Sequence, residues 1–347
     1  MKFLDIQAHG HALGRALGQW GQAAVHTLLL PSAAWHSVQA WKGSTQVQAM
    51  QQLTQQHFPH IWAELEGLAE GLGLRVEDTF LWNCRGDVWA MAPDGCTTVQ
   101  LPATAQQGAR LSHNEDGLPF FQPHCAMVRV QSAASPGSAK LSFAYPGSIL
   151  GHTFAVTEAG WGMAVNNIRT RRVGVGVPRM VLVRAALDMT EPQAVVQLLQ
   201  RHPRAGGFHL SLVQVGEPHI TSVEFTNHRV SVQEIVAPSL HANHLLHPAM
   251  RHHPQWITHS SGFRQERGLA MLQACAQAGH AVDPLEVLRD QHHLQYPIYR
   301  DAPDDSDDEN TMATADMRVC ANGVHWAVYQ GRSAVPVFQF HNTQRVS

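Results

Sequence analysis

The chain has 347 residues and a formal net charge of −3, with 24 Lys and Arg against 27 Asp and Glu. This length allows one large domain or two ordinary ones with a substantial buried core. The small net charge excludes a strong electrostatic attraction to nucleic acid or to an anionic membrane surface. The composition, 44% apolar and 15% charged, is usual for a folded soluble protein rather than a disordered one.

The cysteines and the apolar segments indicate the compartment. No stretch approaches the roughly 18 apolar residues of a membrane span, and the N-terminus lacks the pattern of a signal peptide. The five cysteines show no Cys-x-x-Cys spacing, and their number is odd; they are Cys84, Cys96, Cys125, Cys275 and Cys320. We therefore expect no disulfide scaffold and no zinc ribbon, and the cysteine usage favours a reducing cytoplasm.

The first 90 or so residues predict mainly helices. In "HIWAELEGLAEGLGL" the apolar positions recur at offsets of 4, 7 and 11, which is one face of a helix; they are Ile61, Leu65, Leu68 and Leu72. Pro59 suits the first turn of this helix, and Gly71 and Gly73 are typical of its end.

From about residue 96 the pattern changes to short β-branched and aromatic segments separated by Gly, Pro and Asn turns, which predicts antiparallel hairpins. Two helical stretches interrupt them, at 178–202, with a break at "MTEPQ", and at about 261–278. This order predicts an α+β layered fold and argues against alternating βαβ units. The acidic run "DAPDDSDDEN", 301–310, predicts a solvated loop, because it lacks the glycine and glutamate spacing of a calcium loop.

A histidine cluster follows the predicted strands, in "HANHLLHPAMRHHPQWITH", 241–259. It could suggest zinc, but Pro248 and Pro254 break any helix that would align the imidazoles, and the run contains no carboxylate. We therefore expect a histidine-rich surface loop and no metal site. The cluster contains His241, His244, His247, His252 and His253.

Cys96 lies in "DGCTT", between Gly95 and the hydroxyl residues Thr97 and Thr98. A free cysteine is most often a small buried hydrophobe. However, a glycine before a thiol offers an unhindered carbonyl, so the segment suits attack of the thiol on the Gly95 carbonyl. Hydrolysis would then release a chain that begins at Cys96, whose α-amino group has a pKa of about 7.7–8.0. That amine could serve as base for its own thiol, as in threonine nucleophiles.

Three polar residues are candidates for the remaining roles. Asp116, in "HNED", could hold the new amine, because a carboxylate orients and stabilises an ammonium. Asn166, in "GMAVNN", and Asn243, in "LHANHLL", could stabilise an oxyanion, because amides donate hydrogen bonds without a titratable charge. Each asparagine is also a common turn residue, so the assignment depends on their coming together.

These segments, in this order, resemble the acyl-coenzyme A:6-aminopenicillanic acid acyltransferase family, also called the C45 peptidase family. It is a branch of the N-terminal nucleophile hydrolases related to the choloylglycine hydrolases. The resemblance runs from about residue 50 to 340. "DGCTT" resembles the processing site, with Cys96 as nucleophile, and "HNED" resembles the Asn-x-Asp motif, with Asn114 and Asp116. "HANHLL" resembles the oxyanion segment with Asn243, and "FRQER" resembles a helix start that carries an arginine, here Arg264.

The resemblance implies a four-layer αββα sandwich of the N-terminal nucleophile type. Cleavage between Gly95 and Cys96 would give a mainly helical chain 1–95 and a catalytic chain 96–347, associated within one domain. The enzyme would cleave the amide of a small N-acyl compound through a thioester, without a cofactor, nucleic acid or membrane; self-association into a homo-oligomer is left open. Transfer of an acyl group from a CoA thioester or an amide to an amine is one alternative. A non-catalytic or histidine-rich metal-binding protein is another.

Two departures from the family concern the substrate. The penicillin-making members carry an arginine where this chain has the acidic run 301–310, and the choloylglycine pattern has an arginine where this chain has His113. An acidic loop near the site would repel a carboxylate, so we expect a neutral or amine-bearing substrate. The basic cluster Arg169, Arg171 and Arg172, which could bind CoA phosphates, is typical of a solvated turn.

Overall fold

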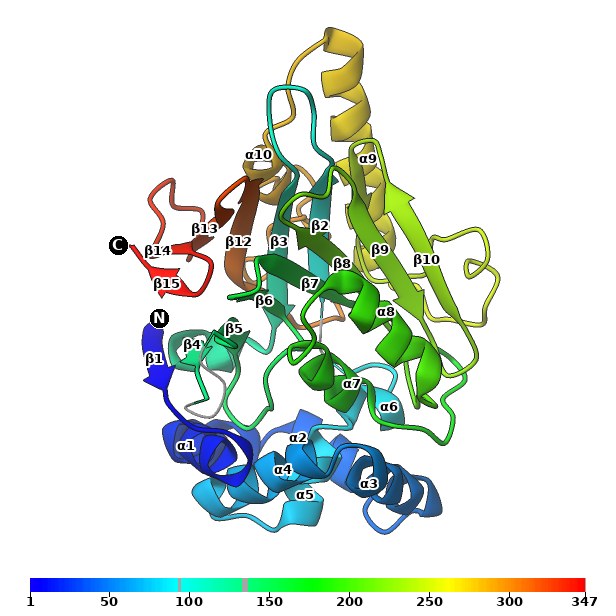
Figure 1. Ribbon diagram of the computed structural model, residues 1–347. Helices are drawn as coiled ribbons and strands as arrows, with labels where there is room; N and C mark the ends of the chain where they lie inside the picture. Colours follow the sequence, from blue (N-terminus) through cyan, green and yellow to red (C-terminus); the bar gives the residue numbers. More distant parts are fainter. Residues whose placement is uncertain (93–94, 133–136, 347) are drawn as a thin grey trace.

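Two β-sheets packed against each other form the centre of the molecule, as seen in a computed structural model that describes residues 1–92, 95–132 and 137–346 (Figure 1). Helices lie on the outer faces of the sheets and gather at one end, at the bottom of the view. The α+β class predicted from the element order is confirmed.

The first sheet, sheet A, has the strand order β1-β4-β5-β6-β7-β8-β9-β10. The pairings are antiparallel except for β1 with β4, which is parallel. The strands are β1 (Lys2–Ile6), β4 (Ala126–Val130), β5 (Lys140–Ala144), β6 (Phe154–Thr157), β7 (Trp161–Asn167), β8 (Phe208–Gln214), β9 (Ile220–Phe225) and β10 (Val230–Ile235).

The second sheet, sheet B, has the order β11-β2-β3-β12-β13-β14-β15 and is antiparallel throughout. Its strands β2, β3 and β13 contact β7 of sheet A, so the sheets meet face to face. The strands are β2 (Cys96–Leu101), β3 (Arg110–Gly117), β11 (Ser239–His241), β12 (Asn310–Cys320), β13 (Gly323–Tyr329), β14 (Phe338–His341) and β15 (Gln344–Arg345).

Helices cover both outer faces. α8 (Pro192–Arg201) contacts β8, β9 and β10 of sheet A. α9 (His259–Ala278) contacts β11, and α10 (Pro284–Leu288) contacts β2 and β3 of sheet B. The layers therefore run helix, sheet, sheet, helix, which is consistent with a sandwich. The predicted break in the helical stretch 178–202 is present, because α7 (Arg179–Ala186) ends before α8 begins.

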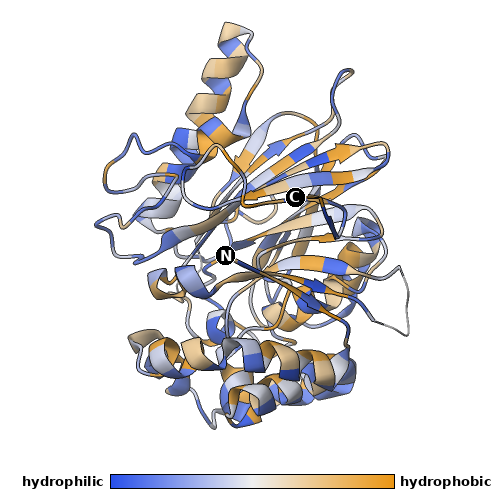
Figure 2. Ribbon diagram, turned by 90° about the vertical axis from the view of Figure 1, so that its left-hand side faces the viewer, coloured by the Kyte–Doolittle hydropathy of each residue, from blue (hydrophilic) through white to orange (hydrophobic). Residues whose placement is uncertain are grey.

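The N-terminal region is mainly helical, as predicted, apart from β1. Hydrophilic and hydrophobic residues are mixed along these helices (Figure 2), so each can bury one face. The helices are α1 (Gly10–Ala24), η1 (Val25–Leu29), α2 (Ala33–Gln39), α3 (Thr45–His57), α4 (Pro59–Leu72), α5 (Val76–Trp82) and α6 (Arg85–Val88), and the short 3₁₀-helix η2 (Pro119–His124) follows β3. Gly73 ends α4 in the left-handed conformation with φ 69°, as its sequence position predicts.

Helices α1 and α4 pack with their backbones in close approach. A Cβ added at Gly14 would lie 1.8 Å from the Glu64 carbonyl oxygen, and one at Gly67 would lie 1.9 Å from the His11 carbonyl oxygen. Only glycine allows this separation, because any side chain would collide with the backbone of the facing helix.

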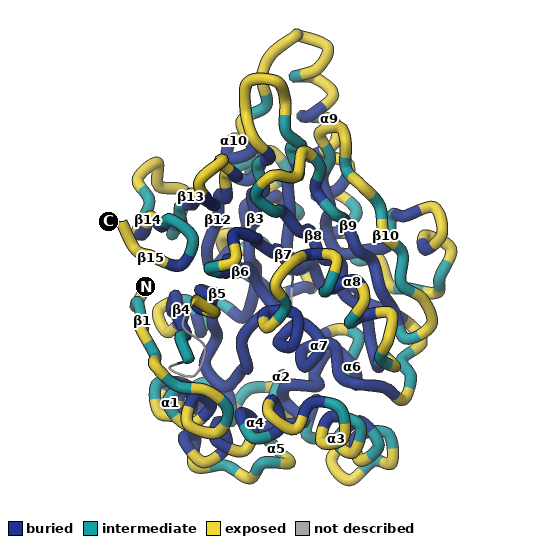
Figure 3. The backbone as a smooth tube through the Cα atoms, viewed as in Figure 1, coloured by how far each residue is buried: buried dark blue, intermediate teal, exposed yellow. Residues whose placement is uncertain are grey.

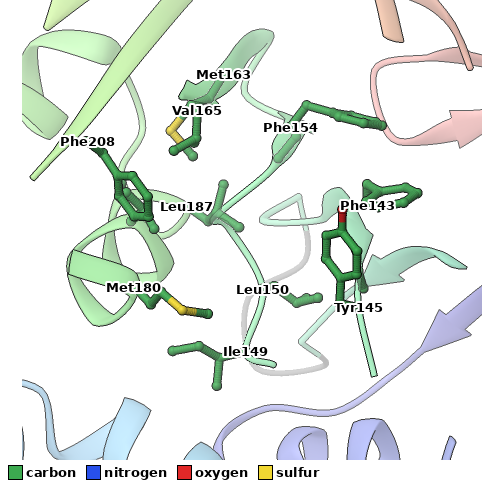
Figure 4. Close-up of a cluster of buried hydrophobic side chains, with 14 of the residues drawn as sticks. Phe143, Tyr145, Ile149, Leu150, Phe154, Met163, Val165, Met180, Leu187 and Phe208 are labelled. Atoms are coloured by element: carbon green, nitrogen blue, oxygen red, sulfur yellow. The ribbon is translucent and has the colours of Figure 1, made fainter. Parts of the chain in front are cut away.

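One hydrophobic core joins the N-terminal helices to both sheets. It includes Leu17 of α1, Leu65 of α4, Leu111 of β3 and Val165 of β7. Met180 of α7 lies near Phe208 in the close-up (Figure 4), and Phe143, Phe154 and Met163 of sheet A belong to the same buried cluster. The central strands are buried along almost their whole length (Figure 3), so polar side chains on them lie in the interior. Within the described part of the chain, no helix is long and apolar enough to cross a membrane.

Candidate active site

Cys96 is the first residue of β2, and 4% of it is exposed. In the antiparallel ladder it faces Glu115 of β3, and Thr98 faces His113. Side chains that face each other in such a ladder, and those two residues apart on one strand, point to the same side of the sheet. Thr98 contacts Asn166 of β7, so this side of sheet B faces sheet A.

The opposite side of the same strands faces the helical layer. Arg264 of α9 donates from Nη1 to the Thr97 hydroxyl at 2.7 Å. Asn114, predicted as a supporting residue, donates to the Leu288 carbonyl of α10 at 2.8 Å and accepts from the Thr314 hydroxyl at 2.7 Å. Its side chain joins β3, β12 and α10, which is a structural role.

Arg264 is fully buried and connects α9 to Cys96. Its Nη1 donates to the Cys96 carbonyl oxygen at 2.5 Å, and its Nη2 donates to Asn243 Oδ1 at 2.7 Å. Its Nε donates to the Ser260 hydroxyl at 3.2 Å. Burial lowers the pKa of Arg264, while Asp116 raises it. The planar guanidinium reaches acceptors on several sides, which a point charge could not do.

Asn243 holds the nitrogen of Cys96. Its Oδ1 accepts from the Cys96 backbone N–H at 3.0 Å and from Arg264, while its Nδ2 donates to the Asn167 carbonyl at 3.2 Å. The sequence analysis assigned the holding of this nitrogen to Asp116 and an oxyanion role to Asn243. In this arrangement Asn243 is the residue that contacts the nitrogen.

Asp116 contacts the carbonyl on the other side of the same peptide bond. Its backbone N–H donates to the Gly95 carbonyl oxygen at 2.9 Å. Its Oδ1 accepts from the Thr311 hydroxyl at 2.7 Å. Burial raises the pKa of the Asp116 carboxyl, while the charges of Arg264 and Arg300 oppose this effect. The 95–96 peptide bond is therefore held at its oxygen by Asp116 and at its nitrogen by Asn243.

Asn166 positions Thr98. Its Oδ1 accepts from the Thr98 hydroxyl at 2.7 Å and from His209 Nδ1 at 3.2 Å. Its Nδ2 donates to the His241 carbonyl at 3.1 Å. These bonds connect Asn166 to Cys96 through β2, whereas the sequence analysis expected it to donate to an oxyanion.

Three side chains, which we call the thiol triad, lie close together: Cys96, His113 and Glu115. The Cys96 thiol donates to Glu115 Oε2 at 3.6 Å, and His113 Nε2 lies 3.2 Å from the same oxygen. Tyr145 donates from its hydroxyl to Glu115 Oε1 at 3.0 Å. Sulfur, imidazole nitrogen and carboxylate oxygen lie within 4.8 Å of one another, so the triad could hold an ion such as Zn²⁺. Glu115 and Tyr145 were not predicted as site residues; the register of "CTT" against "HNE" in the first hairpin points to Glu115.

Gly95 is required by the close approach of Glu309. A Cβ added at Gly95 would lie 2.0 Å from Glu309 Oε2 and 3.3 Å from the Cβ of Asp116. Arg169 donates from Nη2 to Glu309 Oε1 at 3.1 Å. Burial raises the pKa of Glu309 to about 7, against the opposing charges of Arg169 and Arg300.

The acidic run 301–310 is only partly solvated, which corrects the prediction for it. Asp305 forms a buried ion pair with Arg300 at 2.7 Å, and Asp307 accepts from the Thr258 hydroxyl at 2.9 Å. Glu309 and Arg169 are buried together, so Arg169 does not lie in a solvated basic turn either. Arg300, which pairs with Asp305, directly precedes the run, whereas Arg169, which pairs with Glu309, comes from a distant segment that the local composition cannot reveal.

The histidine cluster is also different from the predicted surface loop, because His241, His244 and His247 are buried. His241 stacks on His209 with ring centroids 3.4 Å apart and binds Glu224 Oε1 at 3.0 Å. His244 bonds the Ser261 hydroxyl of α9, and His247 bonds the hydroxyls of Ser222 and Ser231 on β9 and β10, so these imidazoles are satisfied in the interior. His252 and His259 are exposed, as expected.

A small cavity of about 20 Å³ is large enough for about one water molecule. Tyr145, which binds Glu115, forms part of its wall. The lining residues are Trp82, Arg85, Gly117, Leu118, Phe121, Tyr145 and Ser148.

The fold and the site define a two-sheet α+β protein with a buried cysteine at the start of a central strand. A family model described as acyl-coenzyme A:6-aminopenicillanic acid acyl-transferase matches residues 104–332. The match covers more than half of the chain, so the chain belongs to this family, and membership supports an enzyme that is an acyltransferase or a related hydrolase. The matched range includes Asp116, Asn166, Asn243 and Arg264 and begins after Cys96. A search of curated proteins finds no match.

Proposed function

We propose that this protein is a self-processing cysteine amidohydrolase with the sandwich fold of the N-terminal nucleophile hydrolases. The observation that carries the proposal is the way in which the 95–96 peptide bond is held. Asp116 N–H binds the Gly95 carbonyl oxygen, Asn243 binds the Cys96 nitrogen, and Arg264 binds the Cys96 carbonyl. A peptide bond clamped on both sides next to a thiol is arranged for intramolecular attack.

The first reaction is cleavage of the chain itself. The Cys96 sulfur attacks the Gly95 carbonyl carbon, a C–S bond forms, and the C–N bond to Cys96 breaks. The thiol proton ends on the Cys96 nitrogen, and water then hydrolyses the thioester to a Gly95 carboxylate and a free thiol. The Asp116 N–H stabilises the oxyanion of this step, since it already points at the oxygen.

The second reaction repeats this chemistry on a small N-acyl substrate. The free amine of Cys96, with a pKa of about 7.7–8.0 in model compounds, accepts the thiol proton and returns it to the leaving amine. The Arg264 guanidinium orients the new N-terminus at Cys96. Its Nη1 donates to the Thr97 hydroxyl, and its Nη2 donates to Asn243 Oδ1. The thioester then passes to water, or to an amine acceptor.

The substrate charge is less restricted than the sequence analysis expected. The carboxylates of Asp305 and Glu309 are paired with Arg300 and Arg169, so the acidic run does not present an uncompensated negative surface. The expectation of a neutral or amine-bearing substrate therefore loses much of its physical basis.

Acyl transfer from a CoA thioester is the second candidate. The family match favours it, because the family description names an acyl-transferase. Arg171 and Arg172 are exposed and could meet phosphates, although Arg171 also lies over the Trp256 ring at 4.0 Å.

An intact-mass spectrum of the purified full-length protein tests the proposal. We expect two chains that separate before Cys96, one uncut chain for Cys96→Ala, and normal cleavage for the control Cys84→Ala, which removes another buried cysteine. A panel of N-acyl amines, N-acyl amino acids and acyl-CoA thioesters then separates hydrolase from transferase. An uncut wild-type chain without amidase activity would show that the proposal is wrong.

A further inference from the structure

We propose that Glu115 is the base that takes the proton of the Cys96 thiol during cleavage of the chain, with His113 sharing that proton. This inference rests on the self-cleavage proposed above. It assigns to a carboxylate the step that the mature enzyme would perform with its own terminal amine.

The need for a separate base follows from the state of Cys96 before the cut. Its nitrogen is then a peptide N–H that donates to Asn243 Oδ1, so it has no basic lone pair to offer. A free thiol has a pKa of about 8.5, and its thiolate is the nucleophile. Another group must therefore accept the thiol proton, and that group must lie within reach of the sulfur.

Glu115 is placed by the backbone ladder of the sheet. Cys96 and Glu115 are direct partners in the β2–β3 pairing, so their side chains emerge next to each other from rigid strands. The thiol donates to Glu115 Oε2 at 3.6 Å, and the Tyr145 hydroxyl holds Oε1 at 3.0 Å. The carboxylate is thus fixed with one oxygen directed at the sulfur.

The hydrogen-bond directions around Thr98 determine which nitrogen of His113 carries a proton. The Asn166 amide donates from Nδ2 to the His241 carbonyl, so its Oδ1 is the acceptor that faces Thr98. The single Thr98 hydroxyl proton goes to that oxygen. Thr98 Oγ1 must therefore accept from His113 Nδ1, which lies at 2.8 Å.

It follows that a neutral His113 directs the lone pair of Nε2 at Glu115 Oε2, 3.2 Å away. Both atoms can accept a proton, and the Cys96 thiol is the donor that faces Glu115 Oε2 at 3.6 Å, so a proton that leaves the sulfur can be shared between the carboxylate and the imidazole. The thiol supplies that proton as it attacks.

The electron and proton balance is complete without another reactant. The proton moves from Sγ to Oε2 as the C–S bond forms, and His113 Nε2 stabilises the resulting acid as a hydrogen-bond acceptor. The proton passes to the Cys96 nitrogen as the C–N bond breaks. Glu115 is a carboxylate at the start and at the end of the step.

The chain contains a second buried carboxylate–imidazole pair that serves as a matched control. Glu224 accepts from His241 Nε2 at 3.0 Å and from the backbone N–H groups of Leu246 and His247. Glu224→Gln also removes the charge of a buried carboxylate that is bonded to an imidazole, but neither residue of this pair takes part in the proposed cleavage.

The test follows cleavage of the full-length chain with time after cell-free synthesis, by intact mass, for wild type, Glu115→Gln, Glu115→Asp and Glu224→Gln. We expect Glu115→Gln to cleave about 100-fold more slowly, the lower limit usual for loss of a general base, and Glu115→Asp to be intermediate. We expect Glu224→Gln to stay within about threefold of wild type, since this carboxylate lies outside the base step. Circular dichroism shows whether each variant is folded.

If Glu115→Gln does not fold, Glu115→Ala with added formate replaces it, because a small carboxylate restores a missing base but not a missing structural contact. A cleavage rate that rises with formate concentration supports the proposal, and a rate that does not rise refutes it. Wild-type cleavage in folded Glu115→Gln, with Cys96→Ala uncut, would refute this inference and leave the self-cleavage intact. An uncut wild-type chain would instead refute the proposed function on which it rests.

Discussion

Replacement of Arg264 by lysine gives the sharpest test of how the nucleophile is held. Lysine keeps the positive charge but replaces a planar fork with a single nitrogen. The fork now bonds to the carbonyl oxygen of Cys96, Thr97 Oγ1, Asn243 Oδ1 and Ser260 Oγ. One ammonium cannot reach all four, because they lie on different sides of the guanidinium.

The expected loss can be worked out from these bonds. A hydrogen bond to a charged group contributes about 1.5–3 kcal/mol, and an acceptor left unsatisfied in the interior adds to the cost. If lysine retains two of the four bonds, the free energy of unfolding should fall by about 3 kcal/mol. Arg267, one turn further along α9, forms a half-exposed pair with Asp290, so Arg267→Lys should cost less than about 1 kcal/mol.

Urea unfolding of both variants measures the difference. The variants are made in the Cys96→Ala background, in which the proposed cleavage cannot occur, so that intact chains are compared. The same two substitutions with Cys96 present show the effect on cleavage, which should be slow for Arg264→Lys and normal for Arg267→Lys. Equal losses of stability in the two variants would refute the reasoning that the Arg264 fork organises the site.

Three further predictions concern an added methyl group at position 95, the protonation of His244 and metal binding at the thiol triad. Gly95→Ala should slow cleavage and destabilise the chain by about 1–3 kcal/mol, because the added methyl meets the Glu309 carboxylate at 2.0 Å. The control is Gly262→Ala, whose added methyl meets Ile257 Cγ2 at an unstrained 4.0 Å, and equal effects of the two substitutions would contradict this prediction. Burial, with help from nearby cationic groups, lowers the pKa of His244 to about 4, so below about pH 6.5 the unfolded chain binds a proton that the fold excludes. Between pH 7 and pH 5 the free energy of unfolding should therefore fall by about 2 kcal/mol more in wild type than in His244→Gln. If urea unfolding gives the same difference between the two proteins at both pH values, the prediction is wrong. Cd²⁺ should slow cleavage through the thiol triad and EDTA should restore it, so a rate unaffected by excess Cd²⁺ would exclude this site.

Much of the fold could be predicted from local patterns. The hairpins after residue 96, the break between α7 and α8, and the end of α4 at Gly73 each depend on a short run of residues. Strand β1 was not predicted, because "KFLDI" is too short to show periodicity and its partner β4 lies far along the chain. Such long-range pairing leaves no mark in the local sequence.

The site could be predicted as a set of residues but not as a set of contacts. Asp116, Asn243 and Arg264 do come together around the backbone of Cys96. Which of them binds the nitrogen and which the carbonyl depends on side-chain direction and strand register. No sequence motif marks Glu115 as a site residue. It belongs to the proposed site only because it lies opposite Cys96 in the β2–β3 ladder.

Strand β1 and the helices that follow it determine how the two chains would unfold and refold after the proposed cleavage. β1 is hydrogen-bonded to β4, and Leu17 and Leu65 belong to the same core as the sheets. The two pieces could then separate only by exposing that core, so separation and unfolding would be one event. Refolding would become a second-order encounter that slows on dilution, while the uncut chain refolds at a rate independent of concentration. The lifetime of the cleaved protein would thus depend on its unfolding rate. Whether unfolding is reversible would depend on whether the 95–96 peptide bond is intact.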